Sequence, residues 1–332
     1  MIRRLLITAL LAGTAACSNA PGGDSAYERG LAALAEGQPR TARIEFLNAI
    51  KEQPNSPKLR LFQAETYLAL GDGIAAQAEL ERAQQLGARP AETSHLMAHA
   101  LLVRGDYVAS AEKAAAAVPE HRAYASRIRG LALMNSGDLA GAAAAFEHAI
   151  RAGPNDHRVW VAVSRFRRAG GDLAGAVAAA DKAIALKADD VEAIVLRGEL
   201  TRSQYGLRAA LPWFDRAIEI DPGNVVALLE RAATFGDMGA MRAMLADTRK
   251  ALSLSPANAR AYFLQAMLAA RGGDFELARS LHQRTRGAFD GQPAGMLLAS
   301  AIDYQTGAYS QAVLRLTRLV GLQPDNRKAR KL

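Results

Sequence analysis

A glycine recurs at an almost constant interval along most of the chain, and this repeat constrains the fold more than any other feature. It occurs at Gly37, Gly71, Gly105, Gly137, Gly171, Gly239, Gly273 and Gly307. The intervals are 34 residues, except for one of 32 and one of 68, in which the missing member falls at Tyr205 beside Gly206. Such a period predicts an array of repeats that contact only their neighbours, and not two or three separate globular domains.

Each recurring glycine lies between two stretches with helical spacing, and it allows the tight turn of a helical hairpin. A small residue stands seven places earlier, which lets the two helices approach closely. This column reads Gly30, Ala64, Ala98, Gly130, Ser164, Gly198, Ala232, Ala266 and Ser300. Apolar residues follow the glycine at i, i+4 and i+7, as in Ala42, Phe46 and Ala49. Proline, which cannot continue a helix, ends most units at Pro54, Pro154, Pro222, Pro256 and Pro324.

The composition agrees with a helical array and excludes several classes of protein. Hydrophobic residues make up 50% of the chain and aromatic residues only 6%, which argues against an all-β fold. The formal net charge is +8, but the basic residues are spread along the chain without interleaved aromatic residues. We therefore expect no nucleic-acid partner.

Two helices, a 34-residue period and a closing proline resemble the tetratricopeptide repeat (TPR) pattern. The segment VEAIVLRGELTRSQYGLRAALPWFDRAIEIDPGN is one of its clearest units, whereas the family's tryptophan appears in its usual column only as Trp160. The resemblance implies an all-α TPR solenoid of about nine helix-turn-helix repeats over residues 25–332, wound into a right-handed superhelix. After Pro324 the sequence NRKARKL begins another first helix and stops. Either the array is truncated at its C-terminus, which we favour, or its capping helix is short.

The N-terminus has the layout of a secretory signal peptide. Residues 1–16 place two arginines before a short apolar stretch and then small residues. The lone cysteine, Cys17, stands at this boundary, and the context resembles a bacterial lipoprotein signal, although Thr14 stands where that pattern prefers leucine. The resemblance implies lipidation of Cys17 and a tether over residues 17–24. Ser18 in place of aspartate implies the periplasmic face of the outer membrane. Ordinary signal cleavage with an incidental cysteine is the alternative.

The sequence shows none of the common motifs of catalysis or cofactor binding. It has no Gly-rich phosphate loop, nucleophile elbow, H-E-x-x-H motif or cysteine ligand set. His95 and His99 share a helix face and could hold a transition metal, but no third ligand is near in the sequence. We therefore interpret them as exposed polar residues, and expect no metal, no cofactor and no enzymatic activity.

The first helix of each unit lines the concave surface in TPR proteins, so the resemblance implies a binding groove there. The matching columns, with two residues at the rim, give His95, His99, Tyr124, Arg127, Arg158, Arg165, Arg168, Glu199 and Arg202. Arginine dominates this set and suits carboxylates, so we predict a positive groove for acidic or C-terminal peptide segments. The competing interpretation is that these arginines are only solvated helix positions.

The predicted function is a non-catalytic scaffold that is anchored by lipid and organises an envelope complex. The lipoprotein signal followed by Ala-rich repeats resembles the TPR lipoproteins of the PEP-CTERM and exosortase system, which implies export of exopolysaccharide or sorted proteins. Two alternatives remain: a pilotin-like lipoprotein that helps to assemble a secretin or pilus, and an accessory protein that binds an anionic glycan.

Overall fold

The computed structural model describes residues 25–331, which form nineteen α-helices and one short 3-10 helix, with no strand in that range. These residues fall into two compact units that divide between Pro119 and Glu120. The predicted signal peptide (1–16), Cys17 and the tether up to residue 24 lie outside the described residues. No helix within residues 25–331 is long and apolar enough to cross a bilayer.

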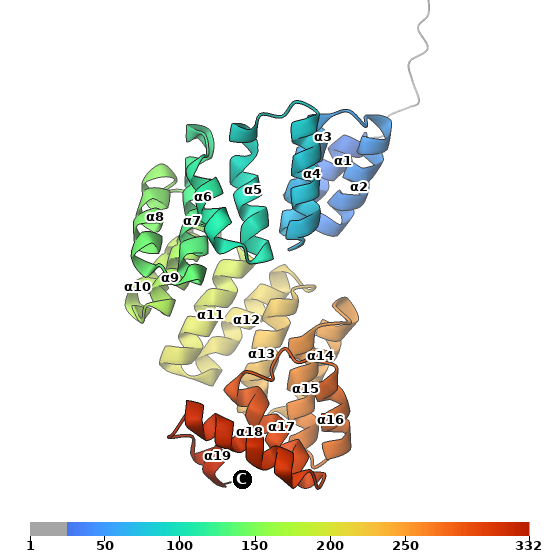
Figure 1. Ribbon diagram of the computed structural model, residues 1–332, viewed down its shortest axis with the longest axis vertical. Coiled ribbons are helices and arrows are strands. Elements are labelled where there is room, and N and C mark those ends of the chain that lie inside the picture. Colours follow the sequence, from blue (N-terminus) through green and yellow to red (C-terminus); the bar gives the residue numbers. More distant parts are fainter. Residues whose placement is uncertain (1–24, 332) are drawn as a thin grey trace, which may run out of the picture. The chain divides into compact units, whose positions relative to one another are not determined.

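The N-terminal unit contains three helical hairpins (Figure 1). Their helices are α1 (Ala26–Ala35) with α2 (Pro39–Glu52), α3 (Pro57–Ala69) with α4 (Gly73–Gln85), and α5 (Pro90–Arg104) with α6 (Tyr107–Ala115). The 3-10 helix η1 (Pro119–His121) follows them in the chain.

The C-terminal unit continues the pattern with six further hairpins. They are α7 (Arg122–Ser136) with α8 (Leu139–Ala152), α9 (His157–Ala169) with α10 (Leu173–Leu186), α11 (Val191–Tyr205) with α12 (Leu207–Ile220), α13 (Val225–Asp237) with α14 (Met241–Leu254), α15 (Ala259–Arg271) with α16 (Phe275–Gln283), and α17 (Pro293–Gln305) with α18 (Tyr309–Leu322). A short helix, α19 (Arg327–Lys331), follows. Nine hairpins within residues 25–331 confirm the predicted all-α repeat array.

The turn inside every hairpin contains a glycine with a positive φ, between 70° and 91°. Gly206 takes this role in the sixth hairpin, one residue after the position that the period predicts. An aspartate often follows the glycine because it caps the second helix. Oδ1 of Asp138, for example, accepts a hydrogen bond of 2.8 Å from the backbone N–H of Gly141. The Gly-Asp signal is therefore a turn followed by an N-cap.

The small-residue column lets the two helices of a hairpin touch. In three hairpins the column holds glycine, and a phenylalanine ring sixteen residues later fills the space. A Cβ atom added at Gly30, Gly130 or Gly198 would lie 2.6–2.7 Å from Cε1 of Phe46, Phe146 or Phe214. The core then continues into the next hairpin, as where Phe146 and Val159 share one cluster of buried residues. The repeats therefore bury their apolar faces against one another.

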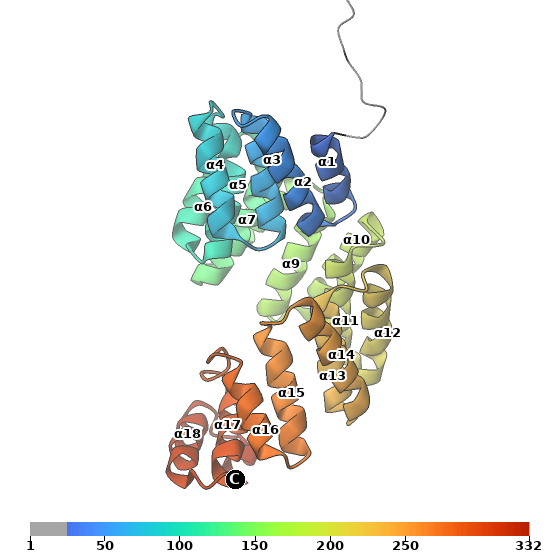
Figure 2. The same cartoon turned by 90° about the vertical axis from the view of Figure 1, so that its right-hand side faces the viewer.

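The first helices of successive hairpins also contact one another directly. In the C-terminal unit, α7 contacts α9, α9 contacts α11, α11 contacts α13, and α13 contacts α15 (Figure 2). Side chains on these first helices can therefore pair from one repeat to the next.

Candidate functional site

A pocket of about 250 Å³ lies on the first helices of the fifth, sixth and seventh hairpins. Its lining comes from α9, α11 and the start of α13: Arg165, Arg168, Val191, Glu192, Val195, Leu196, Glu199, Asn224 and Val226. Three of the predicted groove residues, Arg165, Arg168 and Glu199, therefore meet in one place.

One side of the pocket is apolar. Val195 and Leu196 on α11 are buried and form a fixed surface, whereas Val226 on α13 is 55% exposed. Asn224 begins α13, because its Oδ1 accepts a 3.0 Å hydrogen bond from the backbone N–H of Ala227. This cap holds the first turn of α13, and with it Val226, at the edge of the pocket. Such a wall suits an aliphatic or aromatic side chain of a ligand.

The other side of the pocket carries charges that are already paired. Arg165 on α9 forms a 2.6 Å ion pair with Glu192 on α11. Arg168, one helical turn later, is ion-paired and hydrogen-bonded to Glu199. These two ion pairs join α9 to α11. An incoming anion therefore competes with Glu192 and Glu199 for the two arginines.

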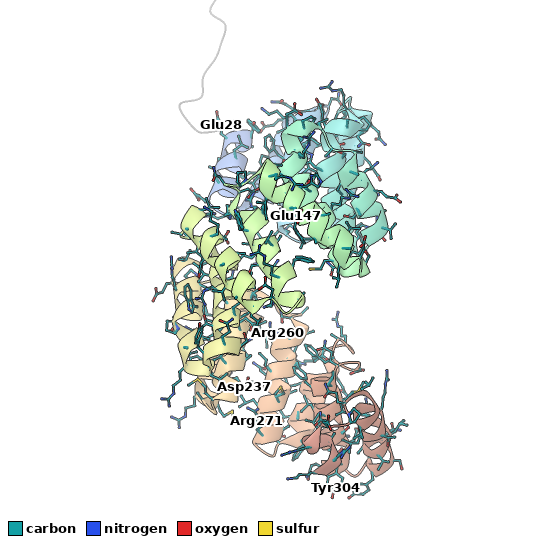
Figure 3. All side chains as sticks on the ribbon, turned by 90° about the vertical axis from the view of Figure 1, so that its left-hand side faces the viewer. Glu28, Glu147, Asp237, Arg260, Arg271 and Tyr304 are labelled. Carbon is teal, nitrogen blue, oxygen red and sulfur yellow. The ribbon has the colours of Figure 1, made fainter. Side chains whose placement is uncertain are left out.

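The pairing continues along α13 and α15. Glu230 is buried, with 4% of its surface exposed, and it forms ion pairs of 2.7 Å with Arg202 and 2.6 Å with Arg260. Arg260 stands near the start of α15 and is labelled in Figure 3. We call these contacts the ion-pair ladder: Arg165–Glu192, Arg168–Glu199, Arg202–Glu230 and Arg260–Glu230.

The ladder determines the charge state of Glu230. Burial alone would raise the pKa of this carboxyl, but the hydrogen bonds and positive charges of Arg260 and Arg202 hold the pKa below its ordinary value of 4.5. Glu230 is therefore ionised at neutral pH and neutralises part of the charge on two helices.

Glu199 is the one acid in the predicted groove set, but Glu192 and Glu230 also pair with arginines of that set. Both had a signal in the sequence. Glu192 occupies the same rim position in its repeat as Tyr124 and Arg158, and Glu230 stands in a column that otherwise holds mainly apolar residues such as Phe62, Leu96, Ile128, Leu196, Leu264 and Leu298.

Arg127 on α7 is a predicted groove residue that lies outside the ladder. Its guanidinium carbon stands 4.8 Å from the centre of the Tyr124 ring. Its Nε atom is buried and has no hydrogen-bond partner among residues 25–331. Burial lowers the pKa of Arg127, mainly because the charged guanidinium is desolvated. Arg158, at the start of α9, is exposed and forms no ion pair within the described part of the chain.

His95 and His99 are not among the residues that line the pocket, since both lie on α5 in the N-terminal unit. The interpretation of both as exposed is wrong. His95 is 7% exposed and His99 is half-buried, because α3, α4 and α6 pack against α5. Across the described residues, no group of three or more His, Cys, Asp or Glu side chains could hold a metal ion.

Comparison with protein families gave one match. The model described as "Tetratricopeptide repeat" matches residues 27–93, 95–157, 129–191 and 242–293, which together cover more than half of the chain. No curated protein matches the chain.

Several solved structures are similar in fold. The crystal structure of PilW, described as a widely conserved type IV pilus biogenesis factor, is 17% identical; the match covers 63% of this chain and 97% of that one, with a TM-score of 0.52. PilF of Pseudomonas aeruginosa is 14% identical over 64% of this chain and 97% of its own, with a TM-score of 0.54. A chain of the APC/C hetero-tetramer Cut9–Hcn1 is 14% identical over 92% of this chain and 61% of its own, with a TM-score of 0.72. At these identities the likeness concerns the fold alone.

Proposed function

Because the chain belongs to the tetratricopeptide repeat family, we propose that it is a non-catalytic scaffold that binds a partner protein through the pocket on α9, α11 and α13. The main support for this proposal is that two different walls meet in the pocket. One is apolar and consists of Val195, Leu196 and Val226, and the other carries the paired charges of Arg165 and Arg168. An extended segment with one bulky apolar side chain and neighbouring acidic residues matches both walls.

The place of this scaffold in the cell is part of the proposal. The signal-like residues 1–16 and the lipidation motif at Cys17 support an anchor on the periplasmic face of the bacterial outer membrane. More than one acyl chain on Cys17 would give a stable attachment. The scaffold would there organise an export or assembly complex for exopolysaccharide or sorted proteins.

A pilotin-like role in assembling a secretin or pilus is the second candidate. The fold likeness to PilW and PilF, each matched over 97% of its own length, favours this role. Those matches cover only 63% and 64% of this chain, so the remaining repeats would need another task. Binding of an anionic glycan comes third, because a glycan offers no bulky apolar side chain to the wall formed by Val195, Leu196 and Val226.

The test is an affinity capture from detergent-solubilised envelopes, analysed by mass spectrometry. Val226→Trp fills the pocket from an exposed position, and Leu139→Trp places the same side chain at an exposed position on α8. We expect the wild type and Leu139→Trp to recover the same partner and Val226→Trp to lose it. The double variant Arg165→Glu/Arg168→Glu, which reverses both charges on α9, should also lose the partner while circular dichroism shows unchanged helicity.

Recovery of the partner by every variant would remove the pocket from the proposal. Recovery of pilus or secretin proteins would favour the second candidate. Retention of acidic glycans by the purified protein, with no partner protein recovered, would favour the third.

A further inference from the structure

The last long helix of the array, α18, presents an uncharged face to solvent (Figure 1). The period of an α-helix places the members of this face on one side, and all of them are exposed. We call it the end face, and it consists of Tyr309, Ser310, Val313, Leu314, Thr317 and Gly321. Tyr309, Val313 and Leu314 are 60%, 63% and 67% exposed. Large apolar side chains that gather in water mark an interaction surface.

A further hairpin would cover only part of the end face. The half-buried counterparts of Val313 in earlier hairpins are Val177, Leu211 and Leu245. The first helix of the next hairpin packs against each of their helices, α10, α12 and α14. The counterparts of Leu314, by contrast, stay exposed inside the array, and they include Ala144, Ala178 and Ala246. Leu314 is therefore a bulky side chain at a position that the packing of repeats leaves in solvent.

The occupant of the end face has to cover both Val313 and Leu314. A helix docked like the next repeat would reach Val313 and leave Leu314 in water. A lipid surface is broad and takes up apolar side chains without a directional fit, so it covers both.

Basic residues without partners follow the end face in the chain. Residues 316–331 hold five basic residues and one acid, Asp325. Arg318, Arg327 and Arg330 are exposed, and none of the three forms an ion pair within residues 25–331. The arginines of the ladder, by contrast, are neutralised by the protein itself. The uncompensated positive charge favours an anionic occupant.

These basic residues border the end face in space. Arg318 lies one helical turn after Leu314, on the same side of α18. Ala329 on α19 is 4% exposed, and Val320 packs against the buried cluster to which Ala329 belongs. Val320 follows Val313 by two helical turns, so α19 lies on the side of α18 that carries Val313. The exposed arginines of α19 are therefore held beside the end face by a buried contact.

A second copy of the chain fits this surface less well, because it would bring the same basic residues together and like charges oppose contact. We propose that the end face and α19 dock on an anionic lipid surface. Val313 and Leu314 enter the interfacial region of the bilayer, and Arg318, Arg327 and Arg330 contact the lipid phosphates. Each basic side chain near an anionic membrane adds to the attraction.

The inference goes beyond the proposed function, because it depends neither on the pocket nor on acylation of Cys17. The test uses the full chain with Cys17→Ser, which removes that acylation site, and adds one cysteine for the fluorophore NBD. Leu314→Cys places the label on the end face. Val108→Cys, the control, places it at a 69% exposed position on α6. NBD emission is recorded with vesicles of phosphatidylcholine alone and with vesicles of equal parts phosphatidylcholine and phosphatidylglycerol.

We expect the label at residue 314 to brighten with the phosphatidylglycerol vesicles and to change little with phosphatidylcholine alone. High ionic strength should weaken the change, because salt screens the attraction. The label at residue 108 should respond to neither kind of vesicle, although its chain has the same N-terminal residues.

Two triple variants test the charges. Arg318→Gln/Arg327→Gln/Arg330→Gln should shift the lipid titration of the label at residue 314 to about a hundredfold higher lipid, since each basic residue contributes about fivefold. The control removes the same charge from exposed positions on α14, as Arg242→Gln/Arg249→Gln/Lys250→Gln, and should shift the titration little. Circular dichroism of the two variants should be the same, because all six side chains are exposed.

An emission change that is equal with both kinds of vesicle, or equal for the labels at residues 314 and 108, would overturn the inference. A change at residue 314 that follows protein concentration without lipid would also overturn it, because the end face would then be a contact between two copies. Either result leaves the pocket, and with it the proposed function, untouched.

Discussion

Gly198 lies directly against the ring of Phe214: a Cβ atom on residue 198 would come within 2.6 Å of Cε1. Gly30 with Phe46 and Gly130 with Phe146 repeat this relationship at the same sixteen-residue separation. The phenylalanine ring on the second helix therefore occupies the space that a side chain at the glycine position would need.

The first prediction concerns this contact. Gly198→Ala should lower the free energy of unfolding by about 2 kcal/mol, because the added methyl group overpacks a closed core. Gly321→Ala is the matched control, since nothing lies within 4 Å of a Cβ there and residue 321 is in α18. That variant should be as stable as the wild type, or more stable by up to about 1 kcal/mol. Urea denaturation followed by circular dichroism measures both, and equal stability of the two variants would contradict the expected overpacking.

The second prediction concerns pH. The pKa of Glu230 is lowered in the folded chain, so folding is favoured by its ionisation, and this contribution is fully present above the unfolded-state pKa. It is lost as the pH falls below about 4.5, the ordinary value for glutamate. Glu230→Gln should therefore cost about 2 kcal/mol at pH 7 and progressively less as the solution is acidified.

Glu147 provides the control for that experiment. It is an exposed residue on α8, 3.7 Å from Arg151, and is labelled in Figure 3. Glu147→Gln should leave stability nearly unchanged at pH 7 and in acidified solution, as expected for a surface ion pair. A cost for Glu230→Gln that stays constant with pH would show that the ladder does not set its ionisation.

The third prediction concerns a buried amide in the N-terminal unit. Gln63 is 0% exposed, and within residues 25–331 neither its Nε2 nor its Oε1 atom has a hydrogen-bond partner. Gln63→Met keeps the length of the side chain and removes the unsatisfied groups, so it should raise stability by about 1 kcal/mol.

A natural control for Gln63 exists at the same position of another repeat. Gln265 also precedes the small residue of its hairpin, but its Nε2 atom donates a 3.2 Å hydrogen bond to Thr248. Gln265→Met should therefore be neutral or destabilising in thermal denaturation. A lower Tm for Gln63→Met than for Gln265→Met would refute the explanation.

The fourth prediction concerns binding. Glu192 holds Arg165 at 2.6 Å, and both side chains are partly exposed. Glu192→Gln releases this arginine to the ligand, so the affinity for a peptide with glutamates beside a leucine should rise a few-fold, the scale of an exposed ion pair. Glu219→Gln on α12 changes the net charge equally at an exposed position outside the pocket. An equal rise in both variants would mean that long-range charge, and not the release of Arg165, is responsible.

Periodicity predicted everything that depends on one hairpin. The turn glycines, the small-residue column and the closing prolines all have the predicted roles, because these contacts occur within about 34 residues. The predicted groove residues also include both members of the Arg168–Glu199 ion pair.

Periodicity did not predict the contacts and the burial that depend on how successive hairpins pack. It places Arg202 on a helix face but does not say which residue of α13 lies opposite, so the buried partner Glu230 was missed. His95 was expected to be exposed for the same reason, since its burial comes from neighbouring helices and not from its own sequence pattern.

The two kinds of contact have different consequences for evolution of the array. A Gly–Phe pair is contained in one repeat, so duplication or transposition of that repeat carries the pair intact. Arg202 and Glu230 belong to successive repeats, and Glu230 is also shared with Arg260 of the repeat after it. Reordering these repeats would leave a buried carboxylate without its cations. The core is therefore interchangeable from unit to unit, whereas α11, α13 and α15 have to be inherited in this order.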